Sequence, residues 1–495
     1  MAAQGAQCRI VAQGFSQVPG VDFRETYAST PKLSTSRYFI WMALSLGLNM
    51  EEFDVTAAYL HSDLEEVVFV KPPFGMERYD ERGRPLFWKL NKSLYGLRQS
   101  GHNWMRDFFA FLRSYGFKQS QQDTSLWFLL GESSVIDMVL FVHTDDGKIA
   151  GRTHEINDVF MAALRSKFNI GAHKRNIDRM FNIKLNHDVE RNSIRFAMPK
   201  YIETMMSEFN ITPDSTVTAP MSADFKMTMQ SELDDTTREK MNDKPYLSLL
   251  SSLFWVSRCC RPDIAVSLSI LSRAASNPEP THWRALIRVL RYTFNTRTLG
   301  ITLRGSPNFH DAVLLVFTDA SFATDPDTGR SISGSFVAID GNILDWTSRH
   351  QPYVTLSSGD AETVAATSAA TQVEYWRQLM EIPRGSPPAA YIPTDSTTAR
   401  NILSNPMHTT TMKHIRTRLL YVRELVSARH FQFFHIPGTE QPADLLTKPL
   451  DGVTLLHLLR SIRSWGGGFS TPDASRLYTS RMTPLGSSKA ASSRL

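Results

Sequence analysis

Two adjacent aspartates, Asp145 and Asp146, stand at the centre of the most constraining segment of this chain. Apolar and β-branched residues precede them in the run 138–142, and Gly147 opens a second β-prone run. This pattern predicts a β-hairpin with the acid pair at its tip. Neighbouring carboxylates repel each other, and the simplest group that neutralises them is a divalent cation such as Mg²⁺. Asp-Asp-Gly also occurs in ordinary turns, so a metal site requires a further acidic partner.

A third acid, Asp54, occupies a similar position far upstream of this pair. It lies at the end of a strand-like run, 50–55, and is followed by small residues and then Tyr59. Two-metal phosphoryl transfer needs carboxylates from separate strands, because they hold two ions roughly 4 Å apart at the attacking and leaving oxygens. We expect Asp54 and Asp145 to supply such a clamp.

Three segments resemble, in order and spacing, the reverse transcriptase of copia-type LTR retrotransposon Pol polyproteins. These segments are Arg9–Gln17, Asp54–Leu60 and Lys92–Ser100. The resemblance implies that Asp54, Asp145 and Asp146 are the metal ligands of a polymerase site. It also implies two Mg²⁺ ions per active site, with Mn²⁺ as the alternative ion.

The same resemblance assigns three nucleotide contacts. Tyr59 matches an aromatic steric gate, which would exclude a 2′-hydroxyl by its volume. Arg9 matches the residue that holds the triphosphate, a role suited to a permanently charged guanidinium. Gln99 matches a residue that lines the nucleotide pocket. The residues alone leave alternatives open, since Tyr59 also suits a core position and Arg9 and Gln99 also suit an ordinary surface.

The chain departs from the family pattern at several positions. His143 and Thr144 replace the usual residues before the acid pair, and Asn182 replaces a Gly in the hairpin that grips the primer. We expect His143 to pack or to contact the primer, because a hard ion prefers oxygen ligands. Asn tolerates positive φ, so the turn at Asn182 is expected to survive. The matching segment starts almost at Met1, so the fingers are expected to be N-terminally truncated.

A second set of acids follows a loop at residues 305–310. Three strand-like runs come next, at Val313–Phe317, Ser335–Ile339 and Ile343–Trp346. A helix is then predicted to begin with Ser357 or Ser358 as its N-cap. Acids occur in turn at a strand end, on this helix, at another strand end and on a last helix: Asp319, Glu362, Asp395 and Asp444.

This order of acids resembles the RNase H domain that follows reverse transcriptase in the same family. The resemblance implies that all four ligate two Mg²⁺ ions, one activating water and the other stabilising the leaving 3′-oxygen. Asp360 competes with Glu362, but residues two apart on a helix face different directions, and the Ala-rich helix that follows favours Glu362. An integrase-like nuclease has an overlapping acid order, yet it gives Asp54, Asp145 and Asp146 no role.

A basic stripe is predicted between the two acid sets. The segment between residues 245 and 265 resembles the thumb and connection of the family. On the helix predicted for 281–292, Arg284, Arg288 and Arg291 are spaced i, i+4 and i+7, opposite an apolar face. Such a stripe suits the phosphates of a template–primer duplex, and a solvated helix face is the alternative.

Composition limits these interpretations. The chain has 495 residues, of which 42% are hydrophobic, and no tract is long enough to span a bilayer, so we expect several soluble cores and no membrane partner. The formal net charge of +5 is carried by residues 453–495, which hold six Lys or Arg against one Asp, so the body is balanced. Its three cysteines show neither a disulfide framework nor zinc spacing, which suits a reducing compartment.

We therefore predict an α+β polymerase palm and fingers with a helical thumb and connection, followed by an α/β RNase H-like domain. The expected domains are fingers and palm at 1–190, thumb and connection at 191–305, an RNase H-like domain at 306–452 and a basic, disordered tail at 453–495.

The predicted function is RNA-directed DNA polymerisation with RNase H activity in retrotransposon replication. The expected partners are an RNA template, a DNA primer, the RNA–DNA hybrid and dNTPs, while the sequence sets no oligomeric state. The alternative is a catalytically decayed fragment that retains only the fold and nucleic-acid binding. The expected location is the cytoplasm, including virus-like particles, with the nucleus as the alternative.

Overall fold

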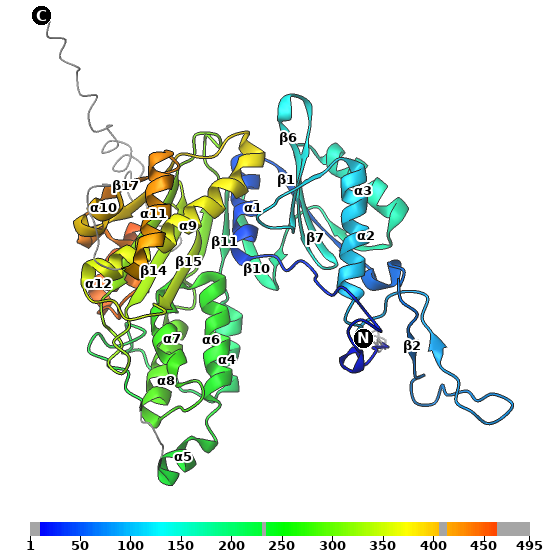
Figure 1. The fold of residues 1–495 in the computed structure, drawn as a ribbon, viewed down its shortest axis with the longest axis horizontal. Coiled ribbons are helices and arrows are strands. Elements are labelled where there is room, and N and C mark those ends of the chain that lie inside the picture. The colour runs from blue at the N-terminus through cyan, green and yellow to red at the C-terminus, as the bar shows by residue number, and fades with distance from the viewer. Residues whose placement is uncertain (1–9, 230–233, 405–412, 463–495) are drawn as a thin grey trace, which may run out of the picture. The chain divides into compact units, whose positions relative to one another are not determined.

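The computed structural model describes residues 10–229, 234–404 and 413–462. The chain folds into two compact units, Met1–Ile177 and Asp178–Leu495 (Figure 1). Within the described residues, no helix combines the length and the apolar character that a membrane crossing requires.

The first unit is built on a six-stranded sheet with the order β4-β5-β6-β7-β1-β8, in which every neighbouring pair is antiparallel. Two short strands, β2 and β3, form a separate ribbon. The elements are α1 (Leu33–Ser45), β1 (Asn49–Val55), β2 (Phe69–Val70), β3 (Trp88–Lys89), α2 (Ser100–Tyr115), β4 (Lys118–Gln119), β5 (Leu126–Leu130), β6 (Ile136–His143), β7 (Asp146–Gly151), α3 (His154–Lys167) and β8 (Ile170–Lys174).

The core of this unit joins two helices to the central strands. Trp104 and Phe108, one turn apart on α2, belong to the same buried cluster as Phe160 and Leu164 on α3. Residues four apart lie on one helix face, so each helix presents an apolar stripe to this core. Phe53 on β1 also belongs to the cluster, which therefore fixes the strand that carries Asp54.

The second unit begins with a four-stranded sheet, ordered β12-β11-β10-β9, and a helical segment inserted between β11 and β12. Its elements are β9 (Arg179–Met180), β10 (Ile183–Asp188), β11 (Ser193–Phe196), α4 (Pro199–Glu208), α5 (Asp235–Asn242), α6 (Tyr246–Cys260), α7 (Ala265–Leu271), α8 (Pro280–Asn295) and β12 (Ile301–Arg304). The turn between β9 and β10 places Phe181 and Asn182 at φ 49° and 61°. The predicted positive φ of Asn182 is therefore confirmed.

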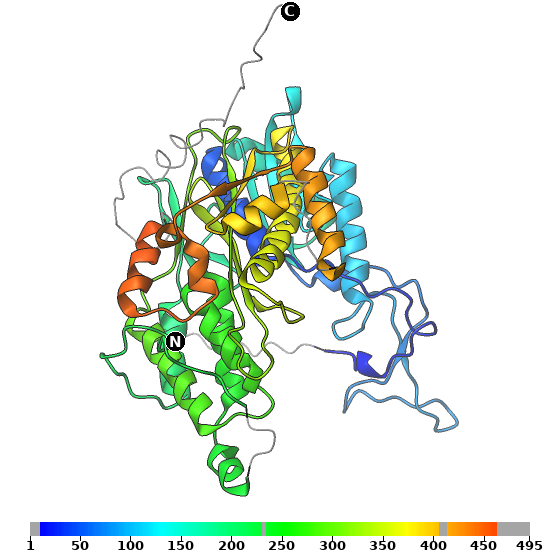
Figure 2. The same ribbon diagram turned by 60° about the vertical axis from the view of Figure 1, so that its left-hand side comes forward.

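A five-stranded mixed sheet follows, with the order β15-β14-β13-β16-β17. β13, β14 and β15 are antiparallel neighbours, whereas β16 pairs in parallel with β13 and with β17. The helix α9 packs against β13 and β14 (Figures 1 and 2). The elements are β13 (Leu314–Ser321), β14 (Ile332–Ile339), β15 (Asn342–His350), α9 (Ser358–Arg384), β16 (Ala390–Thr394), α10 (Thr397–Ser404), α11 (Lys413–Ser427), β17 (Gln432–His435), the 3-10 helix η7 (Pro442–Leu446) and α12 (Gly452–Ser461).

The structure corrects two of the expected boundaries. A border between residues 190 and 191 would separate β10 from β11, which are paired neighbours in one sheet, and the chain divides instead after Ile177. The tail expected from residue 453 begins with helix α12, because Asp451 caps its N-terminus and the side chains of Leu455 and Leu458 are buried. The rest of that tail, from residue 463, lies outside the described residues, and the other boundaries stay predictions.

Candidate metal centres

The backbone brings the three upstream acids together in the first unit. β1 and β7 pair with Asp54 opposite Asp146, and Asp145 lies in the short turn between β6 and β7. Thr144 completes this turn with φ 58°, and the amide of Val55 donates to the carbonyl oxygen of Asp145 at 2.9 Å. The predicted hairpin is therefore confirmed and its backbone pairs with the strand of Asp54, while the convergence of the three carboxylates on a metal stays a prediction.

Two further contacts hold this hairpin in place. The indole Nε1 of Trp104 donates to the carbonyl oxygen of Thr144 at 2.7 Å. At Gly147, an added Cβ would lie only 2.1 Å from Cζ of the Phe53 ring. Glycine is required here because the ring packs directly against the backbone that follows the acid pair. The turn is thus fixed by contacts on both of its sides.

The electrostatics of this acid set are partly balanced by the protein itself. Desolvation raises the pKa of Asp54, and the charges of Asp145 and Asp146 raise it further. Desolvation also raises the pKa of Asp146, and the ammonium group of Lys148 opposes that increase. Lys148 Nζ lies 2.6 Å from Asp146 Oδ1 and 3.1 Å from Glu52 Oε2. Repulsion among the acids is therefore relieved in part by a buried cation.

Tyr59 lies close to these acids. Its ring is half-buried against the core, with its centroid 4.7 Å from that of Tyr95. Desolvation and the nearby charge of Asp145 raise the pKa of its hydroxyl. The two interpretations of Tyr59 are compatible with this position, since the ring contributes to packing and also lies near Asp145. Its role as a steric gate stays a prediction.

Gln99 is buried, with 2% of its surface exposed. Its Oε1 accepts from Gln17 Nε2 at 3.0 Å, and its Nε2 donates to the carbonyl of Asp22 at 2.9 Å. The alternative of an ordinary surface position is therefore wrong, because the amide ties the N-terminal segment to the start of α2. A nucleotide contact of Gln99 stays a prediction. Arg9 lies outside the described residues.

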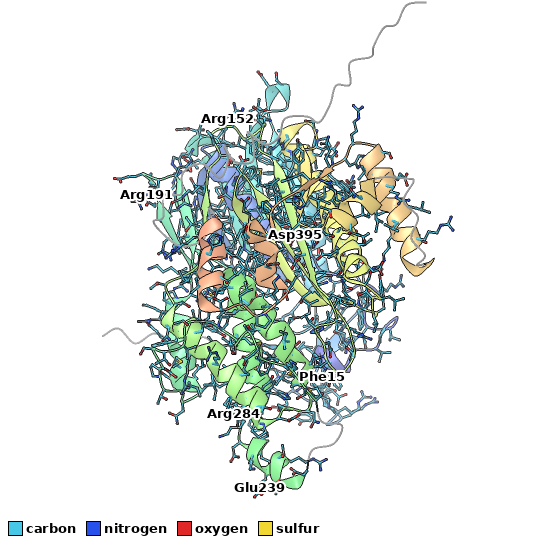
Figure 3. The ribbon with its side chains drawn as sticks, turned by 90° about the vertical axis from the view of Figure 1, so that its left-hand side faces the viewer. Phe15, Arg152, Arg191, Glu239, Arg284 and Asp395 are labelled. Carbon is cyan, nitrogen blue, oxygen red and sulfur yellow. The ribbon has the colours of Figure 1, made fainter. Side chains whose placement is uncertain are left out.

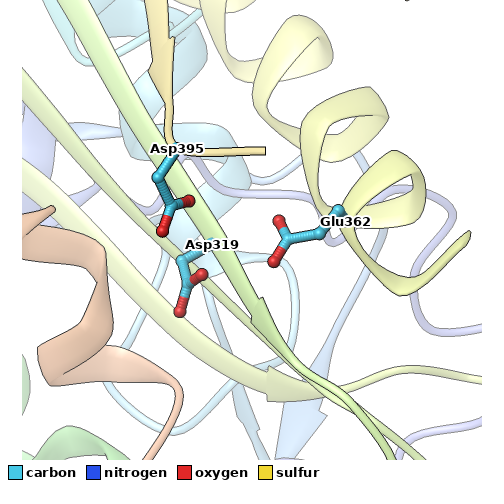
Figure 4. Close-up of side chains that lie close together, drawn as sticks. All are labelled: Asp319, Glu362 and Asp395. Carbon is cyan, nitrogen blue, oxygen red and sulfur yellow. The ribbon is translucent and has the colours of Figure 1, made fainter. Parts of the chain in front are cut away.

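A second acid cluster lies at one end of the five-stranded sheet (Figure 4). Asp319 lies on β13, Asp395 directly follows the parallel neighbour β16, and Glu362 lies near the start of α9. One carboxylate oxygen from each side chain lies within 4.8 Å of the others. In the described part of the chain, no other group of three His, Cys, Asp or Glu residues converges this closely.

Burial and mutual repulsion disfavour the charged forms of this cluster. Burial and the charge of Asp444 raise the pKa of Asp319 to about 6. Burial, together with the charges of Asp319 and Asp395, raises the pKa of Glu362 to about 9. The Oε2 atom of Glu362 is also buried without a hydrogen-bond partner. A divalent cation would relieve both conditions, so these hard oxygen donors fit Mg²⁺.

Asp444 lies beside the three converging acids, on η7. Its charge helps to raise the pKa of Asp319, and its Oδ2 lies 2.9 Å from Nζ of Lys448. Its other oxygen, Oδ1, is buried without a partner. The structure therefore places all four predicted acids in one neighbourhood, with Asp444 paired to a lysine at its border.

Asp360 has a different function from Glu362. The hydroxyl of Ser357 donates to Asp360 Oδ2 at 2.6 Å and accepts from the amide of Asp360 at 3.2 Å. These bonds cap the N-terminus of α9 with Ser357, one of the two N-caps expected. The prediction that Glu362, rather than Asp360, joins the acid cluster is therefore confirmed by the geometry.

The predicted basic stripe lies on α8, and its three arginines differ in their surroundings. Arg284 is exposed on this green helix (Figure 3). Arg288 is half-buried, and Arg291 donates through Nε to the carbonyl of Thr212 at 3.0 Å. A guanidinium nitrogen of Arg291 also lies 3.9 Å from Asp214 Oδ2. The helix and the spacing are confirmed, but Arg291 is engaged by the protein, and phosphate binding stays a prediction.

Polar residues that were not predicted from the sequence surround the acids. Glu52 lies two residues before Asp54, and Lys148 lies two residues after Asp146. Because side chains alternate along a strand, each pair shares a face, so this signal was available in the sequence. Thr447 donates its hydroxyl to Asp319, and no comparable local signal could have identified it.

Known proteins resemble this chain along most of its length. Residues 3–223 match the family "Reverse transcriptase (RNA-dependent DNA polymerase)". The chain is 30% identical over 445 residues to a retrovirus-related Pol polyprotein from transposon TNT 1-94 of Nicotiana tabacum, covering 89% of this chain and 33% of the relative. It is 28% identical over 462 residues to the corresponding polyprotein from transposon RE2 of Arabidopsis thaliana, covering 92% of this chain and 30% of that relative. The chain thus spans about a third of the length of these curated relatives.

Solved structures of ribonucleases H align with part of the chain. RNase H1 from Halobacterium salinarum NRC-1 covers 27% of this chain and 94% of its own, with 16% sequence identity and a TM-score of 0.22. This score is too low to establish a common fold. The interpretation of the second acid cluster therefore depends on its own geometry.

Proposed function

We propose, from the premise that this chain belongs to the copia-type retrotransposon Pol family, that it is an RNA-directed DNA polymerase with an associated ribonuclease H activity. The observation that carries the proposal is the register of β1 and β7, which pairs Asp54 with Asp146 next to Asp145. These acids lie within the residues that match the reverse transcriptase family. The proposed substrates are dNTPs, a DNA primer on an RNA template, and the RNA strand of the hybrid.

In the proposed polymerase site, Asp54, Asp145 and Asp146 would hold Mg²⁺, or Mn²⁺ in its place. The bound ions would supply Lewis-acid activation of the primer 3′-hydroxyl and charge stabilisation of the leaving pyrophosphate. The chain's own contribution is rigidity, since the turn that carries Asp145 is bonded to Val55. Tyr59, close to Asp145, would limit the volume next to the sugar.

In the proposed nuclease site, Asp319, Glu362, Asp395 and Asp444 would hold the second pair of ions. Parallel pairing of β13 with β16 fixes the two strand-end aspartates, and α9 brings Glu362 to them. Thr447 orients Asp319 through its hydroxyl. A site of this geometry would position a phosphodiester for attack by water.

The proposed location is the cytoplasm. Within the described residues, Cys259 and Cys260 are buried and form no disulfide, which suits a reducing compartment. Association with virus-like particles and a nuclear stage are compatible with the same chemistry.

A primer-extension measurement tests the polymerase proposal. The purified chain is incubated with oligo(dT) on poly(rA), radiolabelled dTTP and Mg²⁺, beside Asp145→Asn. We expect the wild type to incorporate nucleotide. Incorporation by the variant should be at least about 100-fold slower, because the substitution removes one carboxylate charge from the site. Equal incorporation by the two proteins would overturn the proposal and favour a decayed fragment that retains only the fold and nucleic-acid binding.

A further inference from the structure

Lys148 is a buried lysine beside the proposed polymerase ligands. Its side chain is 5% exposed, and Nζ lies 2.6 Å from Asp146 Oδ1 and 3.1 Å from Glu52 Oε2. Glu52 and Lys148 are direct partners in the register of β1 and β7. Because Lys148 follows Asp146 by two residues on β7, both side chains point to the same face of the sheet. The backbone therefore aims this ammonium group at Asp146.

A second lysine completes the arrangement around Glu52. Lys174 Nζ on β8 lies 2.7 Å from Glu52 Oε1, and its side chain is 47% exposed. Each oxygen of the buried Glu52 carboxylate therefore has its own ammonium partner. Lys148 also bonds Asp146 at 2.6 Å, whereas Lys174 lies on β8 with a largely exposed side chain. This asymmetry makes Lys174 a matched control for the charge of Lys148.

A divalent ion at Asp54, Asp145 and Asp146 would share Asp146 with this ammonium group. Like charges repel, so a fixed cation bonded to a ligand weakens the binding of a second cation at the same carboxylate. The charge of Lys148 also reaches Asp54, whose pKa it lowers against the effect of the neighbouring acids. In the metal-free protein the same contact orients Asp146 and relieves repulsion within the acid set.

The nuclease cluster has a different arrangement. There the lysine, Lys448, bonds Asp444 at 2.9 Å, beside the three acids whose oxygens converge within 4.8 Å. Glu362 Oε2 in that cluster is buried without a partner. Each acid set therefore has a lysine bonded to one proposed ligand, but Asp444 lies outside the three acids whose oxygens converge.

We propose that Lys148 is a positioning residue, an internal counter-ion that holds Asp146 in the metal-free protein and lowers the affinity of the polymerase site for a divalent cation. This inference rests on the proposed function, since it takes Asp146 as a metal ligand.

The test measures Mn²⁺ binding directly, so it does not depend on whether the chain polymerises. The full chain carries Asp319→Asn and Glu362→Gln to weaken the nuclease site, and binding is followed by calorimetry and by electron paramagnetic resonance. Lys148→Met is compared with this parent, with Lys174→Met as the matched control. Adding Asp145→Asn to Lys148→Met identifies the site that is being titrated.

We expect Lys148→Met to bind Mn²⁺ at least about tenfold more tightly than the parent, because a positive charge next to the ligands is removed. Lys174→Met should change the affinity less than threefold, and Asp145→Asn should abolish the gain. An unchanged or weaker affinity in Lys148→Met, or an equal gain in Lys174→Met, would overturn the inference.

A second variant covers the case in which Lys148→Met does not fold. Lys148→Met combined with Glu52→Gln removes the buried cation and its buried partner together, leaving Asp146 without its ammonium group. A gain in affinity is also expected in that protein, smaller than in Lys148→Met because the loss of the Glu52 charge offsets part of it. An unchanged or weaker affinity would equally contradict the inference. If Mn²⁺ affinity rises in either variant while the wild type incorporates no dNTP, the polymerase proposal fails and the counter-ion inference stands.

Discussion

Asp54 on β1 lies directly opposite Asp146 on β7 in an antiparallel strand pair, although the two residues are far apart in the sequence. Their proximity is therefore a property of backbone register and does not depend on a flexible loop. A slip of one residue would turn Asp54 to the other face of the sheet and separate the acids. The contacts that fix this register are for that reason expected to affect the chemistry of the site.

Gly147→Ala tests the packing beneath the acid pair. The new Cβ would lie 2.1 Å from the Phe53 ring, so either the ring or the hairpin has to move. We expect a loss of about 1–3 kcal/mol in the free energy of unfolding, as for other overpacked cores. Urea unfolding measures this cost, and primer extension should fall with it.

The partner variant Phe53→Leu decides whether the clash is the cause of that loss. In the double variant Gly147→Ala with Phe53→Leu, the smaller side chain should recover part of the stability lost by Gly147→Ala. If the stability lost by the double variant equals the sum of the losses of the two single variants, the proposed packing is contradicted.

Glu51 is expected to make the stability of the first unit dependent on pH. Burial alone would raise its pKa, but hydrogen bonds from His154, Asn157, His173 and Arg175 lower it below the usual 4.5. Because the folded pKa is lowered, the stabilisation is present above pH 4.5 and is lost as the pH falls through the folded pKa.

Glu51→Gln should remove this loss of stability at acid pH. It should also cost about 2–4 kcal/mol at neutral pH, since the half-buried His173 and its neighbours lose their buried anionic acceptor. Urea unfolding between pH 3 and 7 measures both effects. Glu81→Gln, at an exposed position, is the control and should change neither quantity. A parallel pH profile in wild type and Glu51→Gln would refute the assignment.

The arginines of α8 should differ in their contributions to nucleic-acid binding and to stability. Arg284 is exposed, so Arg284→Gln should weaken binding to an RNA–DNA duplex a few-fold. The slope of log binding constant against log salt concentration should fall by about the amount of one phosphate contact. Arg291 bonds Thr212, so Arg291→Gln should instead cost about 1 kcal/mol of stability. Fluorescence anisotropy at several salt concentrations and urea unfolding separate these outcomes. Equal effects of both variants on the salt dependence would contradict the distinction.

Metal binding should stabilise the protein mainly through the nuclease cluster. A ligand at ten times its Kd adds about 1.4 kcal/mol, which corresponds to roughly 2 °C in the unfolding midpoint of a unit the size of Asp178–Leu495. Glu362→Gln should lose most of this Mg²⁺-induced shift, because Glu362 provides one of the three converging oxygens. Asp145→Asn should retain the Mg²⁺-induced shift in the unfolding midpoint. Differential scanning calorimetry with EDTA and with Mg²⁺ tests this, and a full shift in Glu362→Gln would exclude the cluster as the stabilising site.

Much of the acidic geometry could be predicted because its signals are local. The apolar run before Asp145 and the glycine after Asp146 indicate a hairpin, and the positive φ of Asn182 follows from its side-chain chemistry. The three strands before α9 and its Ser357 cap have similarly short-range signals. In these segments local preference and tertiary structure agree.

Other features could not be predicted because they depend on pairing between distant segments. β11 pairs with β12 across the inserted helices, so no local signal placed the unit boundary after Ile177. The burial of Gln99 depends on Gln17 and Asp22, which lie far upstream. Helix α12 is a different case, since its leucine spacing was visible but was outweighed by the Gly- and Ser-rich sequence that follows it.

The central claim is that one chain carries two separate metal-dependent phosphoryl-transfer sites. The most direct test compares three proteins purified in the same way: wild type, Asp145→Asn and Glu362→Gln. Each is assayed with Mg²⁺ for dNTP incorporation and for cleavage of RNA in a labelled RNA–DNA hybrid. We expect Asp145→Asn to lose incorporation at least about 100-fold while it still cleaves, and Glu362→Gln to show the reverse. Loss of both activities in either variant, or wild-type activity no higher than that of both variants, would contradict the account.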